Sequence, residues 1–321
     1  MNPLWLNAVR AAAGAVPSGT TLYTVTTTGA QTHNIASLGV SAAVTVYWGD
    51  GNSDIYTGTA ARSHAYAGAG TWVVSVDEPL YVTTLSLSDN KITLNSSEIA
   101  AISNVNDFRA ISLKAGTFDS ADVVAWRPSY FYLYSMPAGY AGTFDSADVV
   151  AWRPIGFYLH SMPAGYAGTF DSTDVSAWRP SYFWLLSMPA GYAGTFDSAD
   201  VAAWRPNVFY LYSMPTGYTI TAGGGFASWT TTSNFQMQSN GLPTGTVDAI
   251  LWELYRASTV PRTASGGTIN ISGSNAAPSG TYQAAASCPV TVATPGKEIA
   301  HELKNDGCAV GFNKWSTVTT S

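Results

Sequence analysis

The sequence predicts a mainly β protein built around a solenoid, which is a coil of stacked, strand-bearing turns. Three observations predict it: a 26-residue unit recurs four times in tandem, apolar pairs recur along the chain at similar spacing, and β-branched strand patterns precede the repeats. We expect about eight solenoid turns between a strand-rich N-terminal domain and a small α-containing C-terminal cap. The expected boundaries are 1–19 for a docking segment, 20–79 for the first domain, 80–280 for the solenoid and 281–321 for the cap.

The composition describes a folded chain with few charges. Of its 321 residues, 11% are charged and 13% are aromatic, and the formal net charge is -6. Disordered chains have the opposite profile, with many charges and few aromatic residues. No basic patch is present, so nucleic acid is not an expected partner. No stretch approaches the ~20 apolar residues that a membrane span requires, so none is expected.

The first 19 residues predict a short amphipathic helix. Asn2 followed by Pro3 is a typical helix start. The apolar residues that would share one helix face are Leu4, Trp5, Ala8 and Ala12. The segment has no basic leader and Arg10 interrupts its apolar run, so we do not expect a secretion signal. Two roles stay open: docking on another protein, and packing on its own domain.

Strand patterns fill the next 60 positions. TLYTVTTT at 21–28 is rich in β-branched residues, and AAVTVYWGDG at 42–51 runs into a turn. The motif VYWGDG followed by HAYAGAGTWVVSV resembles the PKD-type immunoglobulin-like domain. The matching residues are Trp48, Gly49, Asp50, Gly51, Tyr66, Gly70 and Trp72. The resemblance implies a β-sandwich that serves as a spacer or adhesion module without catalysis, and we interpret Asp50 as a turn former rather than a metal ligand.

The repeats are nearly identical. AGTFDSADVVAWRPSYFYLYSMPAGY at 115–140 recurs with few changes at 141–166, 167–192 and 193–218. One such unit cannot bury its own apolar side, but stacked units bury it against their neighbours. Phe131 and Leu133 are two residues apart, so both point inward from one strand. On the return leg, Asp119 or Ser120 is expected to cap a short helical turn.

Apolar pairs extend this pattern beyond the four copies. They are Leu85/Leu87, Ile111/Leu113, Phe131/Leu133, Phe157/Leu159, Phe183/Leu185, Phe209/Leu211, Phe235/Met237 and Ile269/Ile271. Leu85-x-Leu87-x-x-Asn90-x-Ile92 and Phe235-x-Met237-x-x-Asn240-x-Leu242 resemble the strand and turn of a leucine-rich repeat. The resemblance is to bacterial and phage leucine-rich-repeat proteins and covers roughly residues 80–280. The segment TINISGSNAAPSG at 268–280 is similar to a closing turn of such proteins.

The four copies depart from that family at one position. The Asn of the motif is replaced by Met136, Met162, Met188 and Met214. A buried asparagine ladder is therefore not expected there, although a thioether can fill the space. Trp126, Trp152, Trp178 and Trp204 are expected to form a buried structural column. Residues 246–258 predict a helix, and Thr294-Pro295 and Gly307 are expected to start and stop a helix in the cap.

Differences among the copies point to a candidate site. Within the strand, Phe131, Leu133 and Ser135 are unchanged in every copy, whereas the residues between them vary. We therefore expect the fixed positions to face the core and the variable positions to face outward. The variable columns are Tyr130, Gly156, Tyr182 and Val208; Tyr132, Tyr158, Trp184 and Tyr210; and Tyr134, His160, Leu186 and Tyr212. The flanking turns are expected to supply polar margins, at Thr84, Ser86 and Ser88 and at Asn234, Gln236 and Gln238.

An outward face rich in aromatic side chains is typical of an interaction site. We take the ligand-binding face to consist of Tyr130, Tyr132, Tyr134, Tyr158, His160, Tyr182, Trp184, Leu186, Val208, Tyr210 and Tyr212. Ligand or receptor binding is the first interpretation, and stacked rings also suit the faces of sugars. A contact between copies of the chain and a face covered by another part of the chain are the alternatives.

No pattern of catalytic residues was found. His33, His64, His160 and His301 are scattered, so no metal cluster or catalytic triad is expected. The pairs Asp119/Asp122, Asp145/Asp148, Asp171/Asp174 and Asp197/Asp200 recur in every copy, which argues against a single active site. We expect them to cap turns and to form salt bridges with Arg127, Arg153, Arg179 and Arg205, with calcium binding left as an alternative.

The two cysteines leave a question of pairing open. Cys288 and Cys308 lie 20 residues apart near the C-terminus, and either a disulfide or two buried thiols would suit them. They are too few to form a structural metal site by themselves. No cofactor is expected.

The family resemblance and the composition together suggest a non-enzymatic virion protein of a phage, such as a tail fibre, spike or capsid decoration. The expected ligand is a host-surface glycan or protein bound by the aromatic face, with the N-terminal segment contacting other virion or surface proteins. A bacterial surface adhesin is the second hypothesis. The third is a structural protein that uses the same face for assembly into homo-oligomers.

Overall fold

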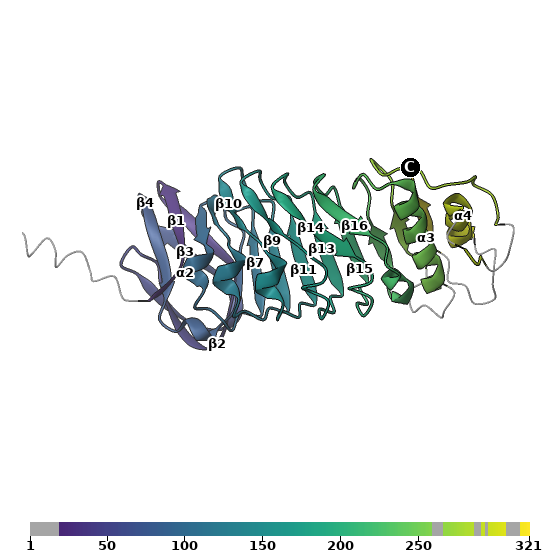
Figure 1. Ribbon diagram of the computed structural model, residues 1–321. Coiled ribbons are helices and arrows are strands. Elements are labelled where there is room, and N and C mark those ends of the chain that lie inside the picture. The colour runs from purple at the N-terminus through teal and green to yellow at the C-terminus, as the bar shows by residue number, and fades with distance from the viewer. Residues whose placement is uncertain (1–18, 259–265, 286–289, 293–294, 306–314) are drawn as a thin grey trace, which may run out of the picture.

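The protein is described by a computed structural model that covers residues 19–258, 266–285, 290–292, 295–305 and 315–321. It is mainly β, and hydrogen-bonded pairs connect all nineteen described strands. The body is elongated, with turns stacked along its length, an antiparallel unit at one end and two helices at the other (Figure 1). The N-terminal docking segment, both cysteines, Thr294 and Gly307 lie outside the described residues, so those predictions stay predictions.

The main sheet of the solenoid is a parallel ladder in which each turn contributes one strand. Its described strands are β5 (Val82–Leu87), β7 (Asp107–Ile111), β9 (Tyr130–Tyr134), β11 (Gly156–His160), β13 (Tyr182–Leu186), β15 (Val208–Tyr212), β17 (Asn234–Gln236), β18 (Thr268–Asn270) and β19 (Thr317–Thr319). The last of these lies within the segment that we expected to be only a cap. The apolar core of each turn is therefore covered by this sheet on one side.

A second parallel ladder runs along another side of the solenoid. Its described strands are β6 (Ile92–Asn95), β8 (Ala115–Thr117), β10 (Tyr140–Thr143), β12 (Tyr166–Thr169), β14 (Tyr192–Asp197) and β16 (Tyr218–Thr221). Short helical turns follow on the return leg: α2 (Ser96–Ile99), η2 (Ser120–Val123), η3 (Ser146–Val149) and η4 (Gly225–Ser228). The tandem repeats thus form one solenoid turn each.

Register in the main sheet corrects one predicted turn. Phe108 and Ala110 of β7 lie opposite Phe131 and Leu133 of β9, and both are fully buried. The predicted inward pair Ile111/Leu113 is therefore wrong for Ile111, which occupies an outward position opposite Tyr134, whereas Leu113 is buried beyond the end of β7. In this turn, both sets of alternating residues include apolar side chains. The pairing of β7 with its neighbouring strands therefore decides which set faces the core.

The N-terminal strands β1 (Thr20–Thr28), β2 (Gln31–Tyr47), β3 (Ser53–Tyr66) and β4 (Ala69–Val76) are antiparallel and join both ladders. The middle of β2 pairs with β5 of the main sheet, and β1 pairs with β6 of the second sheet. Strand β4 pairs with both β1 and β2, so it links the two sheets across the end of the core. A short 3-10 helix, η1 (Pro79–Tyr81), leads into β5. The predicted boundary at residue 80 is crossed by two sets of strand pairs, and a separate PKD-type sandwich stays a prediction.

Aromatic side chains from neighbouring turns fill the core. The rings of Phe131, Phe157, Phe183 and Phe209 stack with centroid distances of 5.5–5.7 Å, close to the spacing of the strands. The predicted tryptophan column is fully buried, and each indole packs against a neighbouring phenylalanine, as Trp152 does against Phe131 at 5.1 Å. Met136 and its three counterparts are also buried, as expected for residues that fill the asparagine position.

A ladder of serine and aspartate side chains ties the return legs together. Ser146 donates to Asp174 of the next turn at 2.6 Å, and Ser120 donates to Asp148 at 2.5 Å. In the first three pairs the other aspartate accepts from the next turn as well, as Asp119 does from the backbone N–H of Thr143 at 2.7 Å. Residues Asp119 and Asp145 stand at the N-caps of η2 and η3 but make no side-chain cap hydrogen bond.

The predicted aspartate–arginine salt bridges are not formed. The guanidinium of Arg127 donates to the backbone carbonyls of Val124 and Trp126, and its counterparts in the other copies do the same. These arginines therefore close their own short turn, where the carbonyl groups at the end of a helical turn need donors. The prediction of ion pairing was wrong, and the prediction of capping was wrong for Asp119 and Asp145, whose carboxylates contact the neighbouring repeat. In the fourth copy, Asp197 does accept from its own turn, from the backbone N–H of Ala199 at 2.8 Å.

Ser135 is invariant for a reason other than burial. We expected it to face the core, but its side chain is exposed and its backbone adopts the left-handed conformation with φ of 58°. Ser112, Ser161, Ser187, Ser213 and Ser239 share this conformation with φ between 51° and 56°. The chain turns away from the main sheet at these positions, so the constraint acts on the backbone rather than on packing.

The C-terminal end contains two helices, α3 (Thr244–Ser258) and α4 (Gly296–Asn305), which confirm the helix predicted at 246–258 and a helix in the predicted cap. Glu253 of α3 is 3% exposed and accepts from Ser198 at 2.9 Å and from the backbone N–H of Gly224 at 2.6 Å. It takes the place that aspartate has in the preceding turns. Burial raises the pKa of this carboxyl, against the lowering effect of its hydrogen bonds.

Asparagines follow the last methionine of the repeats. Asn240 donates to the carbonyls of Leu211 and Met237, and it accepts from the N–H of Met214 at 3.1 Å. Asn275 is buried and donates to the carbonyls of Met237 and Ile271. We predicted the position of Asn240 from its motif, but the spacing of Asn275 differs and gave no such signal.

Candidate functional site

The predicted outward columns are aligned by the main sheet. Tyr132 lies opposite Tyr158, Tyr158 opposite Trp184, and Trp184 opposite Tyr210, because β9, β11, β13 and β15 pair without a register shift. The first and third columns align in the same way. The inward neighbours Phe131 and Leu133 and their counterparts are fully buried, so the alternation of buried and outward positions was predicted correctly for these two columns of the core.

The central column forms a continuous ladder of rings. Tyr132 stacks on Tyr158 with a centroid distance of 4.2 Å and an interplanar angle of 9°. Trp184 stacks on Tyr210 at 4.8 Å and 25°, whereas Tyr158 and Trp184 meet at 4.9 Å with a tilt of 59°. In the third column, Tyr134 stacks on His160 at 4.4 Å and 13°. Stacking along the sheet covers the ring faces and leaves the ring edges directed to solvent.

This geometry restricts how the face could contact a ligand. Rings whose faces are covered by their neighbours offer edges and phenolic hydroxyl groups rather than flat stacking platforms. Tyr182 is the exception: it is 37% exposed, and it has no ring contact among those recorded for the described residues. Its neighbours in the first column are Gly156 and Val208, neither of which carries a ring. The exposed residue Ile155 lies beside Tyr182, since the backbone carbonyl of Ile155 accepts the N–H of Tyr182 at 3.0 Å.

Gly156 and Leu186 differ from the rest of the face. A Cβ atom at Gly156 would lie 2.9 Å from the rings of both Tyr130 and Tyr158, so glycine lets these rings lean over the strand. Leu186 is only 6% exposed and forms the apolar floor between His160 and Tyr212. The other members of the predicted face are half-buried, with Tyr182 exposed.

The margins of the face are polar, but one of them was misplaced. The strand next to β9 is β7, so the neighbours of Tyr130 and Tyr132 are Asp107 and Arg109 rather than the predicted threonine and serines of β5. Arg109 pairs with Asp107 through two hydrogen bonds of 2.8 Å, and its guanidinium lies 4.5 Å from the ring centroid of Tyr132. This cation closes the exposed end of the ring ladder.

On the other margin the prediction was correct for β17. Asn234 and Gln236 lie opposite Val208 and Tyr210, and Asn234 donates to the hydroxyl of Tyr210 at 2.7 Å. Gln238 donates to Gln236, which continues the polar row. The aromatic face is therefore bounded by an ion pair on one side and by amides on the other.

Electrostatics within the face favour neutral side chains. Burial lowers the pKa of His160 to about 4, so its ring is uncharged at neutral pH. Burial likewise raises the pKa of Tyr132, Tyr158, Tyr210 and Tyr212, which keeps their hydroxyl groups protonated. A ligand would meet an uncharged surface with hydroxyl donors at its edges.

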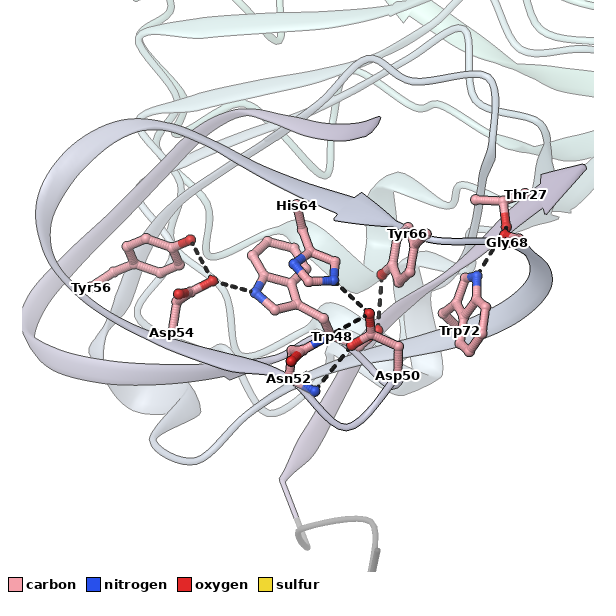
Figure 2. Close-up of polar contacts among 10 residues, drawn as sticks. All are labelled: Thr27, Trp48, Asp50, Asn52, Asp54, Tyr56, His64, Tyr66, Gly68 and Trp72. Atoms are coloured by element: carbon pink, nitrogen blue, oxygen red, sulfur yellow. Dashed lines mark hydrogen bonds and ion pairs between the residues drawn. The ribbon is translucent and has the colours of Figure 1, made fainter. Parts of the chain in front are cut away.

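A second polar cluster surrounds the WGDG turn of the N-terminal strands (Figure 2). Asp50 accepts from the backbone N–H of Asn52 at 3.1 Å and from Nε2 of His64 at 2.8 Å. Trp48 is fully buried and stacks on His64 at 4.8 Å, while its indole N–H donates to Asp54 at 2.7 Å. Asp50 thus holds the turn through its own loop, in agreement with the prediction of a turn former.

A third cluster lies where β1 and β2 meet the first solenoid turn. The hydroxyl of Tyr23 is 2.9 Å from Nε2 of His33, and Nδ1 of His33 is 3.0 Å from Asp89, which also accepts from Lys91 at 2.9 Å. Tyr23 and His33 are fully buried. Burial lowers the pKa of His33, opposed by the carboxylate of Asp89. The sequence gave no indication of this cluster, because Tyr23 and Asp89, the two residues that contact His33, come from different segments of the chain.

In the part of the chain that the structure describes, no three His, Cys, Asp or Glu side chains gather as a group that could hold a metal ion. No helix within the same residues has the length and apolar character needed to cross a membrane. Comparison with known proteins found no match to a family model, a curated protein or a solved structure.

Proposed function

We propose that this chain is a non-enzymatic binding protein that recognises a surface ligand through the outward face of β9, β11, β13 and β15. The observation that carries the proposal is the in-register aromatic ladder from Tyr132 to Tyr210, which lies between two polar margins. Aromatic side chains clustered on an otherwise polar surface are typical of recognition surfaces, because they give contact area at a low cost in side-chain entropy.

Within this face, Tyr182 is the proposed stacking platform. It carries an open ring, with Ile155 beside it, while the neighbouring ladder contributes hydroxyl groups and ring edges. A sugar ring would place its apolar face on Tyr182 and its hydroxyl groups toward these edges. The charge state of the face suits a neutral glycan, although a protein epitope with small polar residues would use the same chemistry.

The proposed setting is a phage virion, where the protein would act in host attachment, and a bacterial surface adhesin is the alternative. Support for the setting comes from the leucine-rich-repeat and PKD-type resemblances of the sequence. The fixed scaffold with variable outward positions supports the role. A repeat that holds its core constant allows the exposed side chains to change without loss of the fold.

The test is binding of the full chain to whole bacterial cells and to a glycan array. Two variants remove the site: Tyr182→Ala alone, and the combined change of Tyr132, Tyr158, Trp184 and Tyr210 to Ser. We expect the single variant to weaken binding by about tenfold, as loss of one ring contact typically costs 1–2 kcal/mol. The combined variant should abolish it.

The matched control replaces exposed apolar residues on another side of the solenoid. Val124 and Val150 are 47% and 44% exposed, so Val124→Ser with Val150→Ser removes exposed apolar side chains away from the face. Circular dichroism confirms that each variant is folded. Equal binding by the control and by the combined variant would sink the recognition proposal. Loss of oligomers instead of loss of ligand binding would assign the face to assembly.

A further inference from the structure

The two ladders of the solenoid end at different points. The main sheet continues past β15 through β17, β18 and β19, whereas the described strands of the second sheet end at β16. Strand β16 pairs with β14 on one edge, and no described strand occupies its other edge. Helix α3 begins at Thr244, one repeat length after Tyr218, so a helix starts where the repeat would place the next strand.

Strand β16 is more regular than its predecessors. In β10, β12 and β14 the third residue is a glycine with φ between 118° and 129°, whose missing Cβ avoids the carbonyl of the preceding turn. The equivalent residue of β16 is Ile220, which is not among the residues with positive φ. The pairing of β14 with β16 extends over four residues, compared with two for the β10–β12 and β12–β14 pairs. Its open edge is therefore straight enough to accept another strand.

The pairing identifies which backbone groups face the open edge. The N–H of Ser198 donates to the carbonyl of Thr221 at 3.2 Å. In a parallel pair, one residue directs both its N–H and its C=O toward the same neighbour, and the next residue directs both to the other side. Ile220 thus points its N–H and C=O away from β14. Strand edges of this kind bind extended polypeptide backbone.

A groove of about 430 Å³ runs along this edge. Its walls include Met214, Tyr218, Ile220, Leu242, Pro243 and Thr246, and no residue that lines it is charged. Hydroxyl groups of serine and threonine residues make up most of its polar lining. The groove therefore combines an open strand edge with neutral walls, and it lies on a different sheet from the aromatic face.

We propose that this groove binds an extended, uncharged segment of a partner protein, which adds to β16 as the next parallel strand. The occupant is a polypeptide because the ladder needs alternating N–H and C=O groups to continue. Its side chains would resemble those of the repeat, since β10 and β12 are each followed in the second sheet by a strand that begins with Tyr-Ala-Gly-Thr. This site acts independently of the aromatic face.

The probe is a fluorescent synthetic peptide with the sequence GYAGTF, as found at 191–196. It is titrated into the full chain by fluorescence anisotropy, and hydrogen exchange is followed at the backbone amide of Ile220. We expect saturable binding, slower exchange at Ile220, and about tenfold weaker binding for Ile220→Pro, which removes one edge donor without touching the bonds to β14.

A second variant leaves β16 unchanged. Thr246→Trp fills the groove from the side of α3 and should also weaken binding by at least about tenfold. The control is Ser176→Trp, which adds the same bulk at an exposed site on the return leg and should bind as the parent does. No binding of the peptide, or equal binding by all variants, overturns the proposal. Self-association of the parent that disappears in both groove variants also overturns it, because the occupant is then a second copy.

Discussion

Ser146 donates its hydroxyl hydrogen to Oδ2 of Asp174 at 2.6 Å, one turn further along the solenoid. The same hydroxyl oxygen accepts the backbone N–H of Asp171 at 2.8 Å. Ser146 is fully buried, so both bonds are shielded from water. The relationship recurs from Ser96 to Ser172, and it ends where Ser198 donates to Glu253 of α3. Adjacent return legs are therefore joined by side chains as well as by strand pairs.

Removing one hydroxyl of this ladder should destabilise the solenoid. Ser146→Ala leaves the N–H of Asp171 without its acceptor, and we expect the free energy of unfolding to fall by about 1–3 kcal/mol. Denaturation in urea, followed by tryptophan fluorescence, measures the change. The control is Ser176→Ala, at an exposed position where the fourth copy already has Ala202. If both variants unfold at the same urea concentration, the ladder does not contribute to stability.

The left-handed serines predict an unusual order of substitutions. At Ser187, with φ of 52°, glycine should be tolerated, whereas valine should be less stable than glycine by about 1–2 kcal/mol because its Cβ branch clashes in this conformation. Thermal unfolding of Ser187→Gly and Ser187→Val tests this order. Ser181, which precedes the strand and is not left-handed, should show the reverse preference. A valine variant at 187 as stable as the glycine variant would contradict the backbone argument.

The near-identity of the turns predicts that their number can change. Deletion of residues 141–166 would remove one repeat. Phe131 of β9 would then lie opposite Phe183 of β13, and equivalent residues would still face one another in both ladders. We expect a folded protein in the parent's oligomeric state, with unchanged circular dichroism per residue and slightly lower stability, since each repeat contributes mainly through its interfaces with its neighbours. Size-exclusion chromatography and circular dichroism check this. As a control, deletion of 13 residues, 141–153, should unfold the solenoid.

His160 should make stability depend on pH. Its pKa in the folded chain is lowered to about 4 from 6.5, so between these values the unfolded chain binds a proton that the folded chain does not. Stability should therefore be fully present above pH 6.5 and decline as the pH falls toward 4. The difference in urea midpoint between pH 7 and pH 5 should be smaller in His160→Tyr, which carries the residue of the first and fourth copies. NMR titration of the His160 ring provides the direct measurement, and a ring that titrates near 6.5 refutes the shift.

Periodicity predicted the parts of the fold that repeat. The outward columns from Tyr132 to Tyr210 were aligned correctly, because repeats of equal length stack with equivalent residues opposite one another. Outside the copies this constraint is lost. At β7 the choice between Phe108/Ala110 and Ile111/Leu113 depended on pairing with β9, and the apolar pattern alone favoured the wrong pair. The consequence for the site was that Arg109 and Asp107 were missed.

Contacts between distant segments were beyond the reach of the sequence pattern. Nothing in the spacing of Tyr23, His33 and Asp89 indicates that they meet, and the joining of β1 to β6 and β2 to β5 depends on the three-dimensional path of the chain. Invariance was also ambiguous. Both Phe131, which is buried, and Ser135, which is exposed, are unchanged in every copy, because core packing and backbone conformation each limit which residue a position accepts.

The linkage of β1 and β2 to the first strands of the two ladders has a mechanical consequence. Hydrogen bonds between turns run along the length of the body, so a pull on the two ends loads them in tension, one turn after another, rather than shearing many strands at once. Under such a load the chain would lengthen in steps of one repeat. If the aromatic face binds a ligand as proposed, that ligand would remain attached to the middle turns while the outer turns open and close again.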